Sequence, residues 1–364
     1  MSKTRDYDEI ICRNKAFVSM EPVDRPLLGI WVGSEIPLQL YQKAAEIFSS
    51  FKGSTIVPQA INPQDFLDDF DRLFLEHEQV GDDLFWPAAP LVGFPWMEAI
   101  VGAPVYASSD TYWTTPYLDN WDKLDEISFS FENKWFQKLL EFKEVLIEHA
   151  KERYPVATSP VPVRGPGDMM GAALGQYRLC LELYDNPEEV KKLASIYTDI
   201  WIRVAKAQIE KTPKFHNGYV VAWYSVWTPE VCQYMQEDSL AYFSPKFYRE
   251  ILLENHVRMA NCFKYPLMHL HPQSLYCLNE LYKIENLKVI EIGRDLFGPS
   301  IFELLPTLKE VQKHKPLLIW GDLTREEIRQ LLNELSPRGL CIYPVVKTVE
   351  EGRSLLKNMK KRKI

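Results

Sequence analysis

The sequence lacks a continuous apolar segment of about 18 residues, the length that a helix needs to cross a bilayer. Its first residues, 1–6, also lack the apolar core of a secretory signal. None of the six cysteines belongs to a C-x-x-C pair, and cysteines in cytosolic proteins are usually reduced thiols. These absences predict a cytoplasmic protein without membrane contact and without structural disulfides.

Basic residues are scarcer than acidic ones, with 42 Lys and Arg against 50 Asp and Glu and a formal net charge of −8. Nucleic-acid binding needs a basic face that neutralises phosphates, so no nucleic-acid partner is expected. The one dense basic run, residues 357–363, falls at the end of the last expected helix, where cations are favourable.

Several nucleotide and hydrolase motifs are absent as well. The chain contains no P-loop, no G-x-S-x-G nucleophile elbow and no H-E-x-x-H zinc motif. No expected strand-to-helix turn carries G-x-G-x-x-G, which argues against an open, doubly wound dinucleotide-binding sheet. Such an open sheet is kept as the alternative fold.

What the chain does contain is an alternation of short apolar segments with longer helical patterns, which predicts parallel strands joined by right-handed crossovers. Eight strands close a barrel, and eight are expected, at residues 26–31, 83–86, 156–161, 218–223, 265–269, 288–292, 316–320 and 339–343. We therefore predict an α/β fold, a (β/α)8 TIM barrel, as a single domain over residues 1–364 with an N-terminal extension.

Helices are expected between these strands, at residues 37–51, 131–154, 187–211, 274–282, 300–314, 324–335 and 348–359. Thr324 at the start of one helix, with Glu327 three residues on, is a capping-box signature. Active sites in barrels of this kind are built from the loops that follow the strands. Candidate functional residues are therefore sought there.

The sharpest local signal is His269-Leu270-His271 at the end of the fifth expected strand. Residues i and i+2 of a strand face the same side, so two imidazoles can converge on one centre. Imidazole is a common zinc ligand, and a catalytic zinc takes three protein ligands. Possible third ligands, left open, are Glu237, Asp238, Glu291 and Cys341. The alternative is two polar residues at a pocket mouth without a metal.

Other polar clusters follow neighbouring strands. Adjacent Glu237 and Asp238 can supply a general acid and a base, or Asp238 with Ser239 can cap a helix. The glycines of the segment 164–168 suit a turn where backbone approaches a ligand, with Asp168 as a helix cap. Asp322 either faces the pocket or caps the next helix. Aromatic residues that can line a cavity for a flat or methylated ligand are Trp86, Trp96, Trp223, Tyr224 and Trp227.

Taken in order along the chain, these segments resemble the uroporphyrinogen decarboxylase-like superfamily, which includes the methylcobalamin:coenzyme M methyltransferases. The resemblance spans residues 24–359, and the fold it implies is a (β/α)8 barrel. The segments on which the resemblance rests are Gly81-Asp82-Asp83, residues 96–105, Gly165-Pro166-Gly167-Asp168, residues 185–190, Glu237-Asp238-Ser239 with Ser244-Pro245, His269-Leu270-His271 and Trp320-Gly321-Asp322-Leu323.

Two departures from the family pattern narrow the function. Uroporphyrinogen decarboxylases carry arginines after the first strand for a substrate with four carboxylates, and residues 29–35 contain none. The methyltransferase branch binds zinc through H-x-C and a cysteine after the last strand. Here the first motif reads H-x-H, and residues 343–346 contain no cysteine.

The resemblance implies a corrinoid-linked methyltransferase-like enzyme that moves a methyl group between a small substrate and a corrinoid protein, with zinc and methylcobalamin as candidate cofactors. Two alternatives remain, a metal-free decarboxylase or lyase of a small carboxylated substrate and a non-catalytic tetrapyrrole-binding barrel. A homodimer is a further expectation. The expected site residues are Asp238 and His271 for catalysis, His269 and His271 for metal, and Trp86, Trp223, Tyr224, Ser239 and Asp322 for substrate.

Overall fold

The computed structural model describes residues 5–51, 53–108, 111–158 and 163–361. Its centre is a seven-stranded parallel sheet in the order β1-β11-β10-β9-β8-β7, with β2 also paired to β11. The strands are β1 (Leu27–Leu28), β2 (Trp31–Val32), β7 (Cys232–Gln236), β8 (Tyr265–Leu270), β9 (Val289–Arg294), β10 (Leu317–Gly321) and β11 (Leu340–Val346). The predicted α/β class is confirmed, together with the expected first strand, which forms two short pieces, and the last four.

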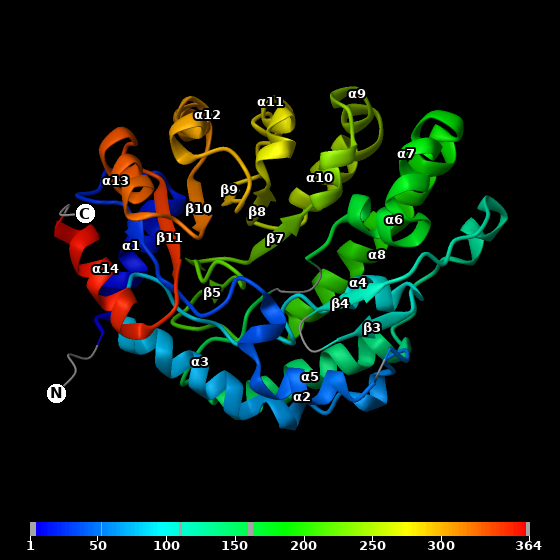
Figure 1. Cartoon of the computed structure of the whole chain (residues 1–364), viewed down its shortest axis with the longest axis horizontal. Coiled ribbons are helices and arrows are strands. Elements are labelled where there is room, and N and C mark those ends of the chain that lie inside the picture. The colour runs from blue at the N-terminus through cyan, green and yellow to red at the C-terminus, as the bar shows by residue number, and fades with distance from the viewer. Residues whose placement is uncertain (1–4, 52, 109–110, 159–162, 362–364) are drawn as a thin grey trace.

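The strands of the second half form because they are apolar along their whole length. In β10 and β11 nearly every residue is buried, as expected for a parallel sheet covered on both faces. Ile319 at the middle of β10 pairs with Ile292 of β9 and Ile342 of β11. Along one side of the sheet run α10 (Leu253–Ala260), α11 (Leu278–Leu281), α12 (Ile301–His314) and α13 (Arg325–Glu334), as Figure 1 shows.

The expected capping box at Thr324 and Glu327 is confirmed, and Ser300 with Glu303 forms a second one at the start of α12. Each pair satisfies two backbone N–H groups that a helix start leaves without partners. Asp322 is therefore not the cap of α13. The last helix, α14 (Val349–Lys361), agrees with the expected helix at 348–359.

The prediction of the fourth strand, at residues 218–223, was wrong. Within residues 218–223 only β5 (Tyr219–Val220) forms, and it pairs antiparallel with β6 (Trp227–Thr228) in a separate hairpin. The strand that joins the parallel sheet is β7, inside a segment expected to be a loop. Its Gln233 and Gln236 interrupt the apolar pattern, although Gln233 is fully buried. A prediction from hydrophobic periodicity missed this strand because polar side chains interrupt its apolar sequence.

The second and third expected strands are also absent as strands from the described residues. Ala88 and Val156 form a single parallel bridge. Val156 begins the third expected strand, whereas Ala88 lies just beyond the second, which was expected at 83–86. The Asp83 N–H donates to Leu28 O of β1 at 2.9 Å, and the Ala157 N–H donates to Ala88 O at 2.9 Å. Residues 159–161 of the expected strand 156–161 lie outside the described residues.

The helices over residues 42–49, 67–80 and 134–150 pack along the side of the molecule opposite α10 to α13 (Figure 1). The expected helix at 187–211 is confirmed, that at 131–154 is shorter, and that at 37–51 is divided. The helices are α1 (Tyr7–Val18), α2 (Gln42–Ser49), α3 (Leu67–Val80), α4 (Trp96–Ile100), α5 (Lys134–Ala150), α6 (Pro166–Leu174), α7 (Gln176–Asp185), α8 (Pro187–Lys211) and the single turn α9 (Pro245–Phe247), with a small hairpin of β3 (Val105–Ala107) and β4 (Tyr112–Thr114).

Asp82 and Asp83, after α3, hold the first strand in place. The Asp83 carboxylate accepts from the Leu28 N–H at 3.0 Å, and Asp82 accepts from the Ile30 N–H at 2.7 Å. These bonds give partners to the buried N–H groups of Leu28 in β1 and of Ile30 between β1 and β2. They thereby fix the segment that leads into Trp31 and the rim of the sheet. Across the described residues, none of the helices has the length and apolar character required to span a lipid bilayer.

Candidate metal centre and adjoining cavity

Asp238, His269 and His271 converge at the carboxyl ends of two neighbouring strands. Gln236 of β7 pairs with His269 of β8, so the residues that follow each strand meet at one edge of the sheet. His271 Nε2 lies 3.2 Å from His269 Nε2 and 3.3 Å from Asp238 Oδ1, and His269 Nε2 lies 3.8 Å from Asp238 Oδ1. Three potential ligand atoms thus face one point, and all lie within 4.8 Å of one another.

Each histidine is held from behind by a carboxylate of β9 or the residue after it. Glu291 contacts Nδ1 of His269, and Asp295 Oδ1 lies 2.7 Å from Nδ1 of His271. The Tyr224 hydroxyl donates to Glu291 at 2.7 Å, which fixes the carboxylate in turn. A carboxylate on Nδ1 keeps the proton there and leaves the Nε2 lone pair for a ligand. This backing is the usual support of histidines that bind metal.

The charges of the cluster favour a cation. Burial would raise the pKa of Asp238, but the hydrogen bond with His271 and the nearby imidazoles outweigh it and lower that pKa to about 2. Burial would lower the pKa of His271, but hydrogen bonds to Asp238 and Asp295 outweigh it and raise that pKa to about 10. Two imidazoles and one carboxylate are a donor set that zinc accepts. The residues present therefore fit a divalent metal ion.

Glu237 is directed away from this centre and holds the start of α6. It accepts from the Asp168 N–H at 3.1 Å, and its other oxygen lies 3.2 Å from Nε2 of His256. Burial raises the pKa of Glu237 to about 8, although the N–H groups of Gly167 and Asp168 act in the opposite direction. A Cβ on Gly165 or Gly167 would lie 2.2 or 2.5 Å from the Glu237 carboxylate. These glycines make room for Glu237 and not, as expected, for a ligand.

Asp168 was expected to cap α6, but the cap residue is Gly165. The Asp168 carboxylate instead accepts from the Ser239 N–H at 2.7 Å, one residue beyond Asp238. Ser239 is buried, and its hydroxyl has no hydrogen-bond partner among the residues that the structure describes. The Asp168–Ser239 bond therefore fixes the turn that presents Asp238.

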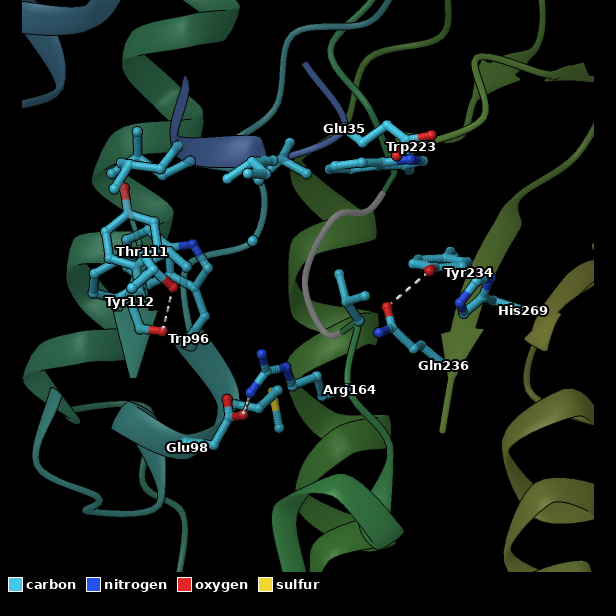
Figure 2. Close-up of a pocket in the computed structure, with 18 of the residues that line it drawn as sticks. Glu35, Trp96, Glu98, Thr111, Tyr112, Arg164, Trp223, Tyr234, Gln236 and His269 are labelled. Carbon is cyan, nitrogen blue, oxygen red and sulfur yellow. Dashed lines mark hydrogen bonds and ion pairs between the residues drawn. The ribbon is translucent and has the colours of Figure 1, made fainter. Parts of the chain in front are cut away.

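A cavity of about 320 Å³ adjoins this candidate metal centre. Its volume is at the lower end of the range typical of small-molecule sites. Figure 2 shows Trp96 and Tyr112 on one wall, with Tyr234 and His269 on the facing side. Aromatic residues supply much of the lining: Phe94, Trp96, Tyr112, Trp223, Tyr224, Tyr234 and Trp320.

The structure brings only part of the expected substrate site to this cavity. Trp223 and Tyr224 line it, as does His271. Trp86 lies in a separate small hollow with Trp31. Ser239 is buried next to Asp238 and does not line the cavity. Asp322 is exposed in the turn after β10, outside the lining. Two further aromatic residues were expected to line a cavity. Trp96 does line it, whereas Trp227 packs against Phe215 in another cluster.

Several site residues were not expected from the sequence. Arg164 and Glu98 form an ion pair at 2.7 Å on the cavity wall. Gln236 donates to Asp238 Oδ2 at 2.5 Å and so orients the possible ligand. Glu291 was proposed as a ligand, and the structure places it behind His269 instead. A glutamate inside a buried strand is itself a signal, since unpaired buried carboxylates are rare.

Neither a protein-family model nor a curated protein matches the chain. Among solved structures, a methyltransferase from Methanosarcina mazei is similar, with a TM-score of 0.65 and 11% sequence identity. The similarity covers 97% of this chain and 98% of that chain. At this identity the likeness concerns the fold, and it extends over nearly the whole length of both chains.

Proposed function

We propose that the protein is a metal-dependent methyltransferase that moves a methyl group between a small substrate and a corrinoid carried by a partner protein. The observation that carries the proposal is the convergence of His269, His271 and Asp238, with a carboxylate behind each imidazole. The full-length fold similarity to a methyltransferase supports the reaction class. Membership of the uroporphyrinogen decarboxylase-like superfamily is part of the same proposal.

The two imidazoles and Asp238 would hold zinc, which would lower the pKa of a substrate thiol or hydroxyl and so supply a nucleophile at neutral pH. Glu291 and Asp295 hold a proton on each Nδ1 atom, so both Nε2 atoms face the proposed metal position, and His271 would release its Nε2 proton when the metal binds. Gln236 fixes Asp238 by a hydrogen bond to its other oxygen. The cavity suits a small substrate, so we place the corrinoid at its mouth on the partner protein.

We also infer that the parallel sheet continues into a closed barrel of eight strands. Parallel bridges at Ala88–Val156 and Arg164–Gln236, and the bond from Asp83 to Leu28, connect the segments between β1 and β7. Each contact lies between segments that are neighbours in a (β/α)8 barrel. Hydrogen exchange tests this: the Asp83, Ala88 and Ala157 amides should be protected about as well as those of β10, and free exchange would contradict closure.

A metal-free lyase is a second candidate, favoured by one observation. His271 and Asp238 lie 3.3 Å apart, and their pKa values are displaced in opposite directions, to about 10 and about 2. Such a pair supplies a proton donor and an ionised carboxylate at neutral pH. A lyase of this kind would lose turnover on His271→Ala and would not require a metal.

Metal analysis separates the two candidates. Protein purified without chelator should contain one zinc per chain, and Asp238→Asn should weaken zinc binding at least about tenfold. Asp185→Asn, which changes an exposed aspartate at the end of α7, serves as the matched control and should bind zinc normally. Zinc-loaded protein should then demethylate methylcobalamin with a thiol, followed by visible absorbance. Absence of zinc together with no demethylation for any thiol would exclude the methyltransferase.

A further inference from the structure

The cavity has two chemically different ends. Figure 2 shows Glu98 with Arg164 at one end and Glu35 with Trp223 at the other, while His269 lies on the side between them. All five residues line the same cavity. The charge at each end decides which part of a substrate can bind there.

The Arg164 end carries a cation that is already neutralised. Its guanidinium donates to the buried Glu98 carboxylate at 2.7 Å, and Asp168 and Asp238 add further negative charge nearby. An anionic substrate group would have to compete with Glu98 for the same donors. This end is therefore not an open anion site.

The Glu35 end carries a carboxylate without a cation. Among the described residues Glu35 forms no ion pair, and its Oε1 is buried without a hydrogen-bond partner. The Asp322 backbone N–H interacts with the carboxylate, but the side chains of Asp322 and Asp295 add negative charge. Burial and these carboxylates raise the pKa of Glu35. Glu35 is half-buried, and a cation arriving here would offset its unpaired negative charge.

Tryptophan rings surround the same end. Trp223 stacks on Trp31 with ring centroids 4.7 Å apart and meets Trp320 edge to face at 5.4 Å. This packing fixes the orientation of both cavity-lining rings, Trp223 and Trp320. Tryptophan has the aromatic face that attracts organic cations most strongly, and desolvation increases that attraction.

We propose that the Glu35, Trp223 and Trp320 end binds a methylated ammonium group, so that the substrate is a small organic cation. Aromatic contacts lead from there to the metal centre, since Tyr224 lies 6.4 Å from Trp320 and 6.3 Å from His269 between ring centroids. The cation would leave its thiol or hydroxyl end at the metal. The placement of that second end rests on the proposed function, whereas cation binding does not.

The test compares choline with 3,3-dimethylbutan-1-ol, a neutral molecule of the same shape. Binding to the purified full chain is followed by calorimetry and by tryptophan fluorescence. Choline should bind at least about tenfold more tightly than the neutral alcohol, within the range of a desolvated cation–π contact. Glu35→Gln and Trp223→Leu should each weaken choline binding about tenfold and change alcohol binding little. Glu21→Gln, an exposed carboxylate outside the cavity, is the control and should bind choline normally.

Equal binding of choline and the alcohol would overturn the inference, as would unchanged choline binding by Glu35→Gln that folds normally by circular dichroism. Transfer assays on the zinc-loaded protein separate this result from the proposed function. Thiocholine should be a better methyl acceptor than 2-mercaptoethanol or 2-mercaptoethanesulfonate. Equal transfer to all three thiols would contradict an organic cation as the substrate and keep the methyltransferase. Choline binding without zinc binding or methyl transfer would contradict the methyltransferase and keep the cation site.

Discussion

His269 on β8 pairs in register with Gln236 on β7 and with Glu291 on β9. The three residues form one row across the sheet, in which Glu291 orients the His269 ring and Gln236 orients Asp238. The possible ligand and its supports therefore come from backbone positions that strand pairing already fixes. Side chains on paired strands are held more precisely than side chains on loops.

Replacing Glu291 with Gln tests the carboxylate behind His269. The change keeps the shape but removes the charge that holds the Nδ1 proton, so zinc affinity should fall about 10- to 100-fold. A competition titration against a zinc-binding dye measures the loss. Glu326→Gln, an exposed glutamate of α13, is the matched control and should leave affinity unchanged. If both variants bind like the wild type, Glu291 does not support the ligand.

Zinc affinity should rise with pH in a defined window. In the metal-free protein the pKa of His271 is raised to about 10 by Asp238 and Asp295 acting against burial, so zinc must displace a proton. Affinity should increase about tenfold per pH unit between about pH 6.5 and 9. The metal-free fold behaves oppositely: the stability from protonated His271 is complete below about pH 6.5 and lost as pH rises through about 10. Zinc titrations at four pH values check the slope, and a flat profile would contradict it.

Glu237→Gln should stabilise the protein at alkaline pH. Burial raises the pKa of Glu237 from an ordinary 4.5 to about 8 in the folded chain. Stability from the protonated form is present below about pH 4.5 and is lost as pH rises through about 8. An amide keeps the bond from the Asp168 N–H and removes the ionisable group, so the variant should gain roughly 2–4 kcal/mol at pH 8 relative to pH 5. Urea unfolding at the two pH values measures the difference, and parallel curves would refute the assignment.

Gly167→Ala should destabilise the fold through Glu237. The added Cβ would lie 2.5 Å from Glu237 Oε2, a contact that the buried carboxylate cannot avoid without movement. A loss of about 1–3 kcal/mol is expected in urea unfolding. In a Glu237→Ala background the same change should cost much less, because the clashing atoms are gone. Equal costs in both backgrounds would show that another contact is responsible.

The parts that local pattern determines were predictable from the sequence. The apolar strands of the second half and the capping residue Thr324 could be recognised in this way. The convergence of His269 and His271 follows from the two-residue period of a strand. The residues that were missed depend on contacts between distant segments. Arg164 meets Glu98 across 66 positions. The polar residues of β7 are tolerated because they find hydrogen-bond partners, Gln233 in the Tyr234 carbonyl and Gln236 in Asp238. Asp295 carries no local sign of its contact with His271.

The two halves of the site have separate origins in the chain. The possible ligands, their supporting carboxylates and Gln236 all lie between residues 236 and 295, on three adjacent strands and the turns after them. Glu35, Trp223 and Trp320 come from three other parts of the sequence. Substitutions can therefore change the proposed substrate end of the cavity without altering the contiguous segment that carries the proposed metal ligands.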